Sequence, residues 1–227
     1  FKGHVATIEW SVPEEFAVYV WLREHGFRIL KRAELLGLVT RSERALCVAG
    51  THGKTTTSTM LAHILHQSHI GANAFLGGIA NNYGTNLLLD GSDNVVVEAD
   101  EYDRSFHRLT PYISVITSMD ADHLDIYGTE AAYIESFEKY ASLVEHALVV
   151  KSRLLQCIVK AASPQCKVYG YGVGEKSDFY ADNVRVKDGE ICFDFHTPEH
   201  VVADVQLGVP IWVNVENGVA AMAVAWL

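Results

Sequence analysis

The chain has 227 residues, of which 49% are hydrophobic, so it is long enough and apolar enough to bury a substantial core. Its 18 basic and 28 acidic residues give a formal net charge of −10. No cluster of Lys and Arg offers the positive surface that binds nucleic acids or anionic membranes. The composition therefore argues against a disordered chain and against nucleic-acid or membrane-surface binding.

The four cysteines are far apart in the sequence and include no C-x-x-C pair, so neither a zinc site nor a disulfide framework is indicated. They are Cys47, Cys157, Cys166 and Cys192. No run approaches the roughly 20 apolar residues that span a bilayer. The N-terminus also lacks the basic-then-apolar pattern of a signal peptide. These features predict a cytoplasmic protein without a membrane segment.

The N-terminal part of the chain contains too little apolar material to form a domain. Residues 13–24 have the pattern of a helix with Pro13 in its first turn, and residues 27–30 have that of a short strand. The chain begins with Phe1 rather than Met, and Leu227 ends an apolar, Ala-rich run with the pattern of an unfinished helix. We therefore expect the parent protein to continue at both ends.

From near Ser42 onward, short apolar runs alternate with helical patterns, which is typical of a parallel α/β sheet. Three runs are continuously apolar, as strands covered on both faces are, and they comprise residues 45–49, 95–97 and 112–117. Each run ends in a cluster of polar residues. Because ligands of open α/β sheets bind beyond the carboxyl ends of the strands, we expect the three clusters to converge on one site.

The later pattern predicts a helix over residues 129–143 and buried strands over residues 146–150 and 167–171. Residues 184–193 predict an antiparallel strand pair, because Asp188-Gly189 at their centre is a strong two-residue hairpin signal. The predicted fold is therefore α/β. It is a P-loop NTPase-like, mostly parallel sheet flanked by helices, with a small antiparallel hairpin region at one edge.

The first polar cluster reads Gly-Thr-His-Gly-Lys-Thr-Thr and lies between a predicted strand and a helix predicted over residues 54–67. Its glycines let backbone amides turn toward phosphates, Lys54 reaches phosphoryl oxygens, and Thr55 suits Mg²⁺. The usual eight-residue motif has Gly where this chain has Val48, and an ordinary Gly-rich turn is the alternative. The predicted nucleotide-binding residues of this loop are Gly50, Thr51, His52, Gly53, Lys54, Thr55 and Thr56.

Acidic clusters follow the other two strands. In residues 98–103, Glu98 is the preferred magnesium ligand, because NTPases hold Mg²⁺ with a carboxylate that ends a buried strand beside the phosphate loop. In residues 120–125, His123 is a neutral imidazole among carboxylates, which suits a second divalent ion or a proton relay. The alternative for both clusters is a solvated acidic loop.

Asn214 and Asn217 open the final predicted helix. Asn is a favoured helix cap, which is one interpretation of these residues. The amide of Asn can also hydrogen-bond the amidine edge of adenine. Both interpretations stay open on these residues alone.

Together, the runs at residues 49–57, 98–101, 120–125 and 214–217 resemble the Mur ligase family in order and spacing. The resemblance implies an ATP-dependent amide ligase of peptidoglycan synthesis, which converts a carboxylate into an acyl phosphate and then into an amide. The His in the first run and the two acidic runs favour the family member that joins L-alanine to UDP-N-acetylmuramate. These two compounds are then the implied substrates, and ATP and Mg²⁺ the implied cofactors.

The resemblance also implies roles for single residues. Lys54 stabilises the transferred phosphoryl group, and Thr55 and Glu98 hold the first Mg²⁺. Glu98 and His123 hold the second. The implied adenine contacts are Asn214 and Asn217. Relatives often carry a His where this chain has Val213, so an imidazole contribution to nucleotide binding is not expected.

The resemblance further implies a division of the chain. Residues 1–41 are the end of the family's N-terminal UDP-binding domain with its linker, residues 42–227 are the central ATP-binding domain, and the C-terminal domain is absent. The chain alone is therefore not expected to ligate. Gly77-Gly78 and Asn81-Asn82 are the loop candidates for contacts with the sugar nucleotide. Two other functions stay open: a ligase that recycles murein tripeptide, and an ATP-binding switch module without ligase chemistry.

Overall fold

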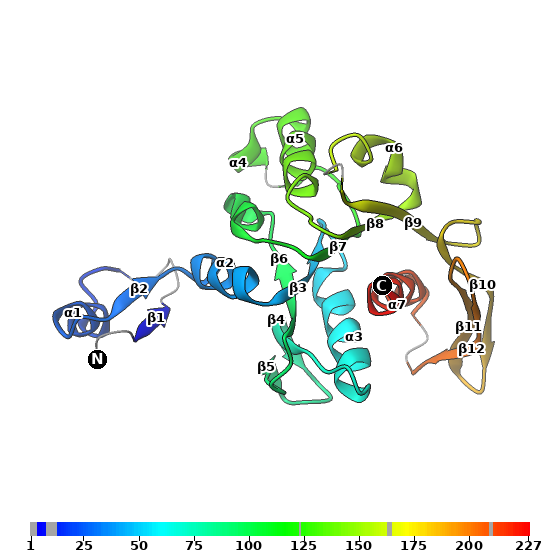
Figure 1. Cartoon of the computed structure of the whole chain (residues 1–227), viewed down its shortest axis with the longest axis horizontal. Coiled ribbons are helices and arrows are strands. Elements are labelled where there is room, and N and C mark those ends of the chain that lie inside the picture. Colours follow the sequence, from blue (N-terminus) through cyan, green and yellow to red (C-terminus); the bar gives the residue numbers. More distant parts are fainter. Residues whose placement is uncertain (1–3, 8–12, 123, 163–164, 209–210) are drawn as a thin grey trace.

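A ten-stranded sheet is the frame of the main body (Figure 1). The computed structural model describes residues 4–7, 13–122, 124–162, 165–208 and 211–227. The strand order is β12-β11-β10-β9-β8-β7-β3-β6-β4-β5. The strands in chain order are β3 (Arg44–Ala49), β4 (Asn73–Ala80), β5 (Thr85–Leu88), β6 (Asn94–Ala99), β7 (Ile113–Ile116), β8 (Ala147–Lys151), β9 (Lys167–Val173), β10 (Phe179–Lys187), β11 (Glu190–His196) and β12 (Val201–Leu207).

The centre of the sheet is parallel, and β3 lies between β6 and β7. Ala49, the last residue of β3, pairs with Ala99 of β6 and with Ile116 of β7. The three predicted apolar strands are thereby confirmed as neighbours. Because they run in the same direction and end at the same level, the polar clusters that follow them emerge at one edge of the sheet.

Helices cover both faces of this sheet (Figure 1). Val48 and Val96 belong to the core beneath α3 and α7, whereas Cys47, Val95 and Val97 belong to the core on the opposite face, beneath α5. This two-sided burial explains why the strands are apolar without interruption. Among the described residues, no helix is both long and apolar enough to cross a membrane. The helices of the main body are α2 (Arg32–Ser42), α3 (Lys54–Gln67), η1 (Tyr102–Arg108), α4 (Leu124–Tyr127), α5 (Glu130–Ala141), η2 (Ser152–Leu154), α6 (Leu155–Ile158) and α7 (Val213–Trp226).

The predicted antiparallel hairpin is confirmed at one edge of the sheet. Lys187 pairs with Glu190, and the two residues between them have positive φ values, 53° at Asp188 and 85° at Gly189. Two positive φ values in a two-residue loop match the turn that follows the natural twist of a hairpin. Strand β12, which the sequence does not predict, adds a third antiparallel strand beyond β11.

The β4–β5 hairpin at the other edge corrects one expectation. Gly77 and Gly78 lie inside β4 rather than in a loop, whereas Asn81 and Asn82 do lie in the turn before β5. Two consecutive glycines usually end a strand, but β4 continues through this pair.

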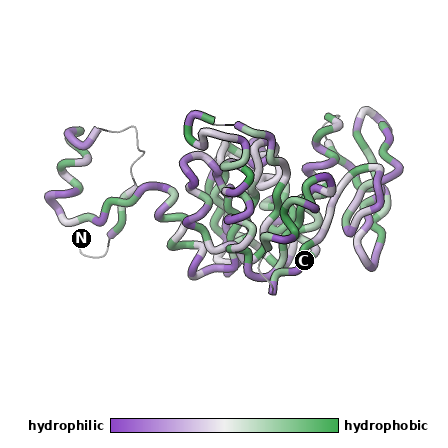
Figure 2. The backbone as a smooth tube through the Cα atoms, turned by 90° about the horizontal axis from the view of Figure 1, so that it is seen from above, coloured by the Kyte–Doolittle hydropathy of each residue, from purple (hydrophilic) through white to green (hydrophobic). Residues whose placement is uncertain are grey.

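A small N-terminal unit is set apart from the main body (Figure 2). It consists of β1 (Val5–Thr7), α1 (Ala17–Glu24) and β2 (Arg28–Leu30), and its two strands pair in parallel. The helix begins at Ala17 rather than at Pro13, because a turn closed by Phe16 N donating to Pro13 O (3.0 Å) comes first. No residue of α1 is buried, so this unit has no helix-covered core of its own.

Helix α2 connects the N-terminal unit to the sheet. Leu36 is buried in the core cluster beneath α5, and Thr40 Oγ1 accepts a hydrogen bond from the amide of Thr110 (3.1 Å). Gly37 lies so close to Arg108 that an added Cβ would be 2.7 Å from its carbonyl oxygen. Helix α2 therefore packs firmly on the main body.

The aromatic core beneath α5 provides a test of the fold. Phe137 is fully buried and contacts the rings of Phe106 and Tyr133 at centroid distances of 5.2 and 5.1 Å. We expect Phe137→Ala to lower the free energy of unfolding by about 3–5 kcal/mol, because it opens a cavity in this core. Urea denaturation measures the loss. Phe16→Ala, at a side chain that is 56% exposed, is the control and should change stability by less than about 0.5 kcal/mol. Similar losses in both variants would contradict the packing described.

Candidate nucleotide-binding site

The loop between β3 and α3 is packed too closely to carry side chains at its glycines. Gly50 has a φ of 134°, and a Cβ there would lie 2.2 Å from Thr117 Oγ1. Gly53 has a φ of 84°, and its Cβ would lie 2.7 Å from Asn217 Oδ1. The predicted strand–loop–helix context is present, with the loop held between the end of β7 and the start of α7.

Hydrogen bonds between this loop and the segment that follows β7 fix the shape of the loop. Thr51 Oγ1 donates to the carbonyl of Asp120 (2.8 Å), and the amide of His52 donates to Ser118 Oγ (2.8 Å). Thr51 Oγ1 is also 2.7 Å from the hydroxyl of Tyr133, and burial raises the pKa of that phenol, so it stays protonated. The first and third predicted clusters are therefore in direct contact.

Lys54 lies at the start of α3 and points back over the loop. Its ammonium donates to the carbonyl of Gly50 (2.8 Å) and to both carboxylate oxygens of Glu101, at 2.7 and 3.0 Å. Glu101 is 1% exposed, and Lys54 is 15% exposed. Glu101 is not among the site residues that the sequence predicts, although it belongs to the same acidic run as Glu98.

Glu98 meets Thr55, which is the arrangement expected of two ligands of one ion. Thr55 Oγ1 donates to Glu98 Oε1 (2.9 Å), and the amide of Gly77 donates to Glu98 Oε2 (2.7 Å). Glu98 follows Val96 by two residues in β6, so both side chains face α3. A Cβ at position 77 would lie 2.2 Å from Glu98 Oε2, so a larger residue there would displace this carboxylate.

A carboxylate and a hydroxyl beside a phosphate loop suit Mg²⁺. This ion prefers oxygen ligands, and it commonly takes one or two protein ligands together with phosphate oxygens and water. Within the described part of the chain, no group of three or more His, Cys, Asp and Glu side chains gathers around a common centre. Thr55 and Glu98 therefore fit a magnesium ion that is shared with a bound phosphate, rather than an ion enclosed by protein alone.

The third cluster is described only in part. Asp120 and Asp122 are exposed after β7, and α4 begins at Leu124. His123 lies outside the described residues. The side chain of Asp120 lies 3.7 Å from Arg153, in an exposed ion pair.

Asn214 lies in the first turn of α7 and Asn217 in the second, against the phosphate loop. Asn217 is buried, and its Oδ1 accepts a hydrogen bond from Thr57 Oγ1 (3.4 Å). Asn217 Nδ2 in turn donates to Asn214 Oδ1 (3.4 Å). The N-cap of α7 is Trp212, so the interpretation of these two residues as helix caps is wrong. The structure brings Asn217 against Gly53 at the end of the loop and Thr57 of α3, and Asn214 contacts Asn217.

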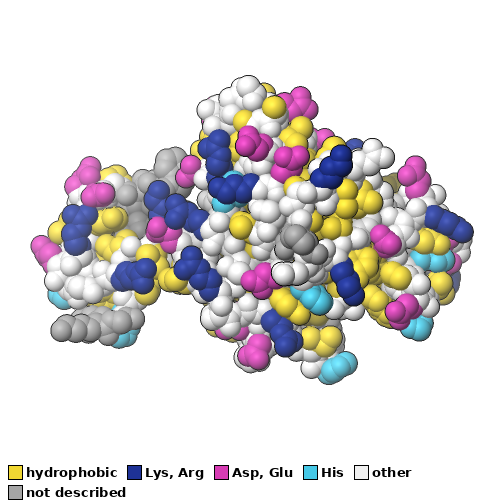
Figure 3. Space-filling model, turned by 45° about the horizontal axis from the view of Figure 1, so that its top comes forward, with side chains coloured by type: hydrophobic (Ala, Val, Ile, Leu, Met, Phe, Trp, Pro, Cys, Tyr) yellow, Lys and Arg dark blue, Asp and Glu magenta, His cyan; other side chains and the backbone are white. Residues whose placement is uncertain are grey.

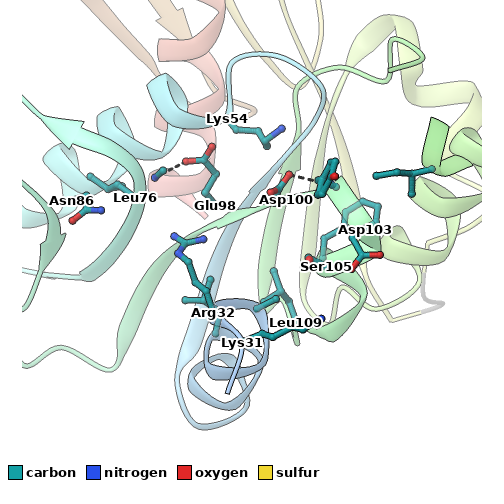
Figure 4. A pocket seen from close by; sticks show the side chains of 16 residues that line it. Lys31, Arg32, Lys54, Leu76, Asn86, Glu98, Asp100, Asp103, Ser105 and Leu109 are labelled. Carbon is teal, nitrogen blue, oxygen red and sulfur yellow. Dashed lines mark hydrogen bonds between the residues drawn. The ribbon is translucent and has the colours of Figure 1, made fainter. Parts of the chain in front are cut away.

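A cavity of about 730 Å³ opens beside Lys54 and Glu98. Figure 4 shows these two side chains close together at one end of it, with Arg32 of α2 across from Glu98. Asn86 of β5 also lines the cavity. Elsewhere the visible surface carries acidic and basic side chains interspersed (Figure 3). Three basic side chains, Lys31, Arg32 and Lys54, and three carboxylates, Glu98, Asp100 and Asp103, line this cavity, so an anionic ligand here would need a cation beside the carboxylates.

Comparison with known proteins identifies the family of this chain. The family model of the Mur ligase middle domain matches residues 48–225. The chain belongs to the Mur ligase family. It is 57% identical over 220 residues to the UDP-N-acetylmuramate–L-alanine ligase of Parabacteroides distasonis. The aligned region covers 96% of this chain and 47% of that protein. The chain thus spans about half the length of the curated relatives it matches.

Solved Mur ligase structures share the fold. The UDP-N-acetylmuramate:L-alanyl-γ-D-glutamyl-meso-diaminopimelate ligase of Neisseria meningitidis matches with a TM-score of 0.80 and 25% identity, over 100% of this chain and 74% of that chain. The UDP-N-acetylmuramate–alanine ligase of Thermotoga maritima matches with a TM-score of 0.77 and 24% identity, over 96% of this chain and 50% of that one. The predicted fold class is confirmed: a mostly parallel, P-loop NTPase-like sheet flanked by helices.

The contact between Gly77 and Glu98 can be tested with two adjacent glycines of β4. We expect Gly77→Ala to displace the Glu98 carboxylate and to weaken Mg²⁺ binding about 10-fold to 100-fold, as loss of the group that orients a metal ligand does. The measurement is the Mg²⁺ concentration that half-saturates ADP binding. Gly78→Ala is the matched control, because its Cβ would meet only Thr55 Cγ2, at 3.4 Å. Equal Mg²⁺ requirements in the two variants would contradict the placement of Glu98.

Proposed function

We propose that this chain is the ATP-binding central part of a ligase that joins L-alanine to the carboxylate of UDP-N-acetylmuramate in peptidoglycan synthesis. One observation carries the proposal. Lys54 and Thr55 of the phosphate loop and Glu98 of the neighbouring strand meet at a single edge of the sheet in a Mur ligase middle domain. The name of the relative that is 57% identical supports the choice of substrates.

The proposed reaction has two steps. A carboxylate oxygen of UDP-N-acetylmuramate attacks the γ-phosphorus of ATP, which releases ADP and leaves an acyl phosphate. The amine of L-alanine then attacks the acyl carbon, the C–O bond to phosphate breaks, and inorganic phosphate leaves with the bonding electron pair. The amine loses a proton to become the amide.

The residues of the loop act mainly by position and charge. Gly50 and Gly53 let backbone amides approach the β- and γ-phosphates, and the ammonium of Lys54 stabilises charge on the transferred phosphoryl group. Thr55 and Glu98 would hold Mg²⁺, which when bound would neutralise the phosphates and draw the anionic carboxylate toward them.

The remaining site assignments extend this proposal. We assign His123, with Glu98, to a second Mg²⁺. Asn214 and Asn217 would contact adenine; the position of Asn217 beside Gly53 of the loop and Thr57 of α3, and its contact with Asn214, support that role. Thr56 would belong to the same loop site.

The proposal also divides the chain. Residues 1–41 would be the end of an N-terminal UDP-binding domain and its linker, and residues 42–227 the central domain. The absence of a buried core around α1 supports this division. The proposed use of ATP and a sugar nucleotide, together with the four free cysteines, supports action in the cytoplasm.

Two other functions compete with this proposal. A ligase for murein tripeptide is favoured by the match to the Neisseria meningitidis enzyme, which covers the whole chain. A nucleotide switch would need only the loop and Glu98. The three candidates differ in which acceptor stimulates phosphate release.

The test measures phosphate release by a full-length ligase that carries this chain, with ATP, Mg²⁺ and UDP-N-acetylmuramate present. We expect kcat/KM to be at least about 10-fold higher for L-alanine than for L-alanyl-γ-D-glutamyl-meso-diaminopimelate, because the acceptor site must discriminate between them. The Lys54→Met variant is the control and should release almost no phosphate. The 227-residue chain alone should show no alanine-dependent release.

Two results would overturn the proposal. Preference for the tripeptide would assign the chain to a recycling ligase. Phosphate release that requires Lys54 but is stimulated by neither L-alanine nor the tripeptide would assign the chain to a nucleotide switch.

A further inference from the structure

The end of β8 brings a lysine to the edge of the sheet that carries the phosphate loop. Val150 of β8 pairs with Ile116 of β7, which pairs with Ala49 at the end of β3. Lys151, the last residue of β8, therefore leaves the sheet at the level where the phosphate loop begins. Because Val149 belongs to the core beneath α7 and side chains alternate along a strand, Lys151 faces α7 as well.

Lys151 meets Glu216 in the first turn of α7. Its Nζ donates to Glu216 Oε2 (2.7 Å), and the two side chains are only 19% and 26% exposed. Tyr171 of β9 pairs with Lys151 and is buried on the same face of the sheet. Burial raises the pKa of the Tyr171 phenol, and the negative charge of Glu216 raises it further, so the phenol stays neutral. Glu216 therefore depends on Lys151 for charge compensation, and loss of either partner would leave a largely buried charge.

The ion pair lies between the two amides that we assign to adenine. Glu216 stands in the sequence between Asn214 and Asn217. The hydrogen bonds of Asn217 with Thr57 and with Asn214 are both 3.4 Å long, which is longer than a strong hydrogen bond. At 2.7 Å, the bond between Lys151 and Glu216 is shorter than either. The amides are thus held lightly by their own contacts, and the ion pair is the firmer polar contact of the first two turns of α7.

The phosphate loop has supports of its own. Thr51 Oγ1 donates to the carbonyl of Asp120 and the amide of His52 donates to Ser118 Oγ, each at 2.8 Å. Thr117 Oγ1 in turn donates to the carbonyl of His52 (2.6 Å). These three partners follow β7 and do not belong to α7. A displaced start of α7 would therefore move the two amides while these supports keep the phosphate loop in place.

We propose that Lys151 and Glu216 are positioning residues whose ion pair sets the start of α7 on the sheet, and so places the amides of Asn214 and Asn217 to select adenine over other purine bases. This inference rests on the proposed function, because it takes the two amides as the contacts to the base. The ion pair acts through the amides and needs no contact with the nucleotide. Its loss is therefore a loss of base recognition, while binding of the phosphates is retained.

The experiment measures the Kd values of Mg-ADP, Mg-IDP and Mg-tripolyphosphate by calorimetric titration of a full-length ligase that carries this chain. IDP has a carbonyl where adenine has an amino group, so it lacks the amidine edge, and tripolyphosphate has no base. We expect Lys151→Met to raise the Kd for Mg-ADP about threefold to tenfold, the scale of one hydrogen bond, and to change that for Mg-tripolyphosphate by less than about twofold. The preference for ADP over IDP should fall by the same factor as the affinity for ADP.

Glu216→Gln is the milder variant, because Gln keeps the shape and one acceptor oxygen but removes the charge. The double variant Lys151→Met/Glu216→Gln should lose no more affinity for Mg-ADP than Lys151→Met alone, because both changes remove the same contact. Lys187→Met, at a lysine of β10 that is 56% exposed, is the matched control for loss of one positive charge. It should leave all three Kd values unchanged.

The inference is wrong if both single variants keep the preference of the unchanged protein for ADP over IDP. It is also wrong if the affinities for Mg-ADP and Mg-tripolyphosphate fall equally, because that pattern marks an ion pair that only supports the fold. If Lys151→Met does not fold, Glu216→Gln decides by the same two criteria. Failure of the proposed function looks different, because the unchanged protein would then bind Mg-ADP no more tightly than Mg-IDP.

Discussion

The parallel pairing of β3 with β6 and β7 is the constraint on which the site depends. Because Ala49 pairs with both Ala99 and Ile116, three chain segments leave the sheet at one level. The phosphate loop, the acidic run and the segment after β7 therefore meet without any long excursion of the chain. Position on the sheet, rather than the identity of single residues, makes Thr55 and Glu98 neighbours.

Charge compensation explains the arrangement of side chains at this edge. The chain has a net charge of −10, and its proposed ligands, ATP and a sugar nucleotide, are anions. Lys54 is paired with buried Glu101, and Glu98 is held by Thr55 and the amide of Gly77. An anion that binds here therefore needs a cation beside the Glu98 carboxylate, which ties nucleotide affinity to Mg²⁺.

The sequence predicts the parts of this site that follow from periodicity and turn chemistry. The strands at the centre of the sheet are buried on both faces, so they are visible as apolar runs. Helix α3 spans the predicted residues 54–67, because the Gly-Lys-Thr run marks its start. The hairpin at Asp188-Gly189 is also predicted correctly, since few residue pairs suit that turn.

Other features depend on contacts between distant segments and are not visible in the sequence. Gly77 and Gly78 have the composition of a loop, yet both lie in β4, and at position 77 the carboxylate of Glu98 occupies the space that a side chain would need. The choice between Glu98 and Glu101 depends on which one faces Thr55 and which one reaches Lys54, and the acidic run alone does not contain that information. Helix α2 is not predicted because Gly37 interrupts its apolar run, and the close packing of this glycine on the carbonyl of Arg108 is not visible in the sequence.

The most direct test of the central claim is the position of a bound metal. A crystal structure of the protein with Mn²⁺ and ADP would locate the ion by its anomalous scattering. The account predicts an ion at about 2.0–2.3 Å from both Thr55 Oγ1 and a carboxylate oxygen of Glu98, with the phosphates of ADP on the loop between Gly50 and Lys54. An ion bound away from Glu98, or a nucleotide bound at another edge of the sheet, would contradict it.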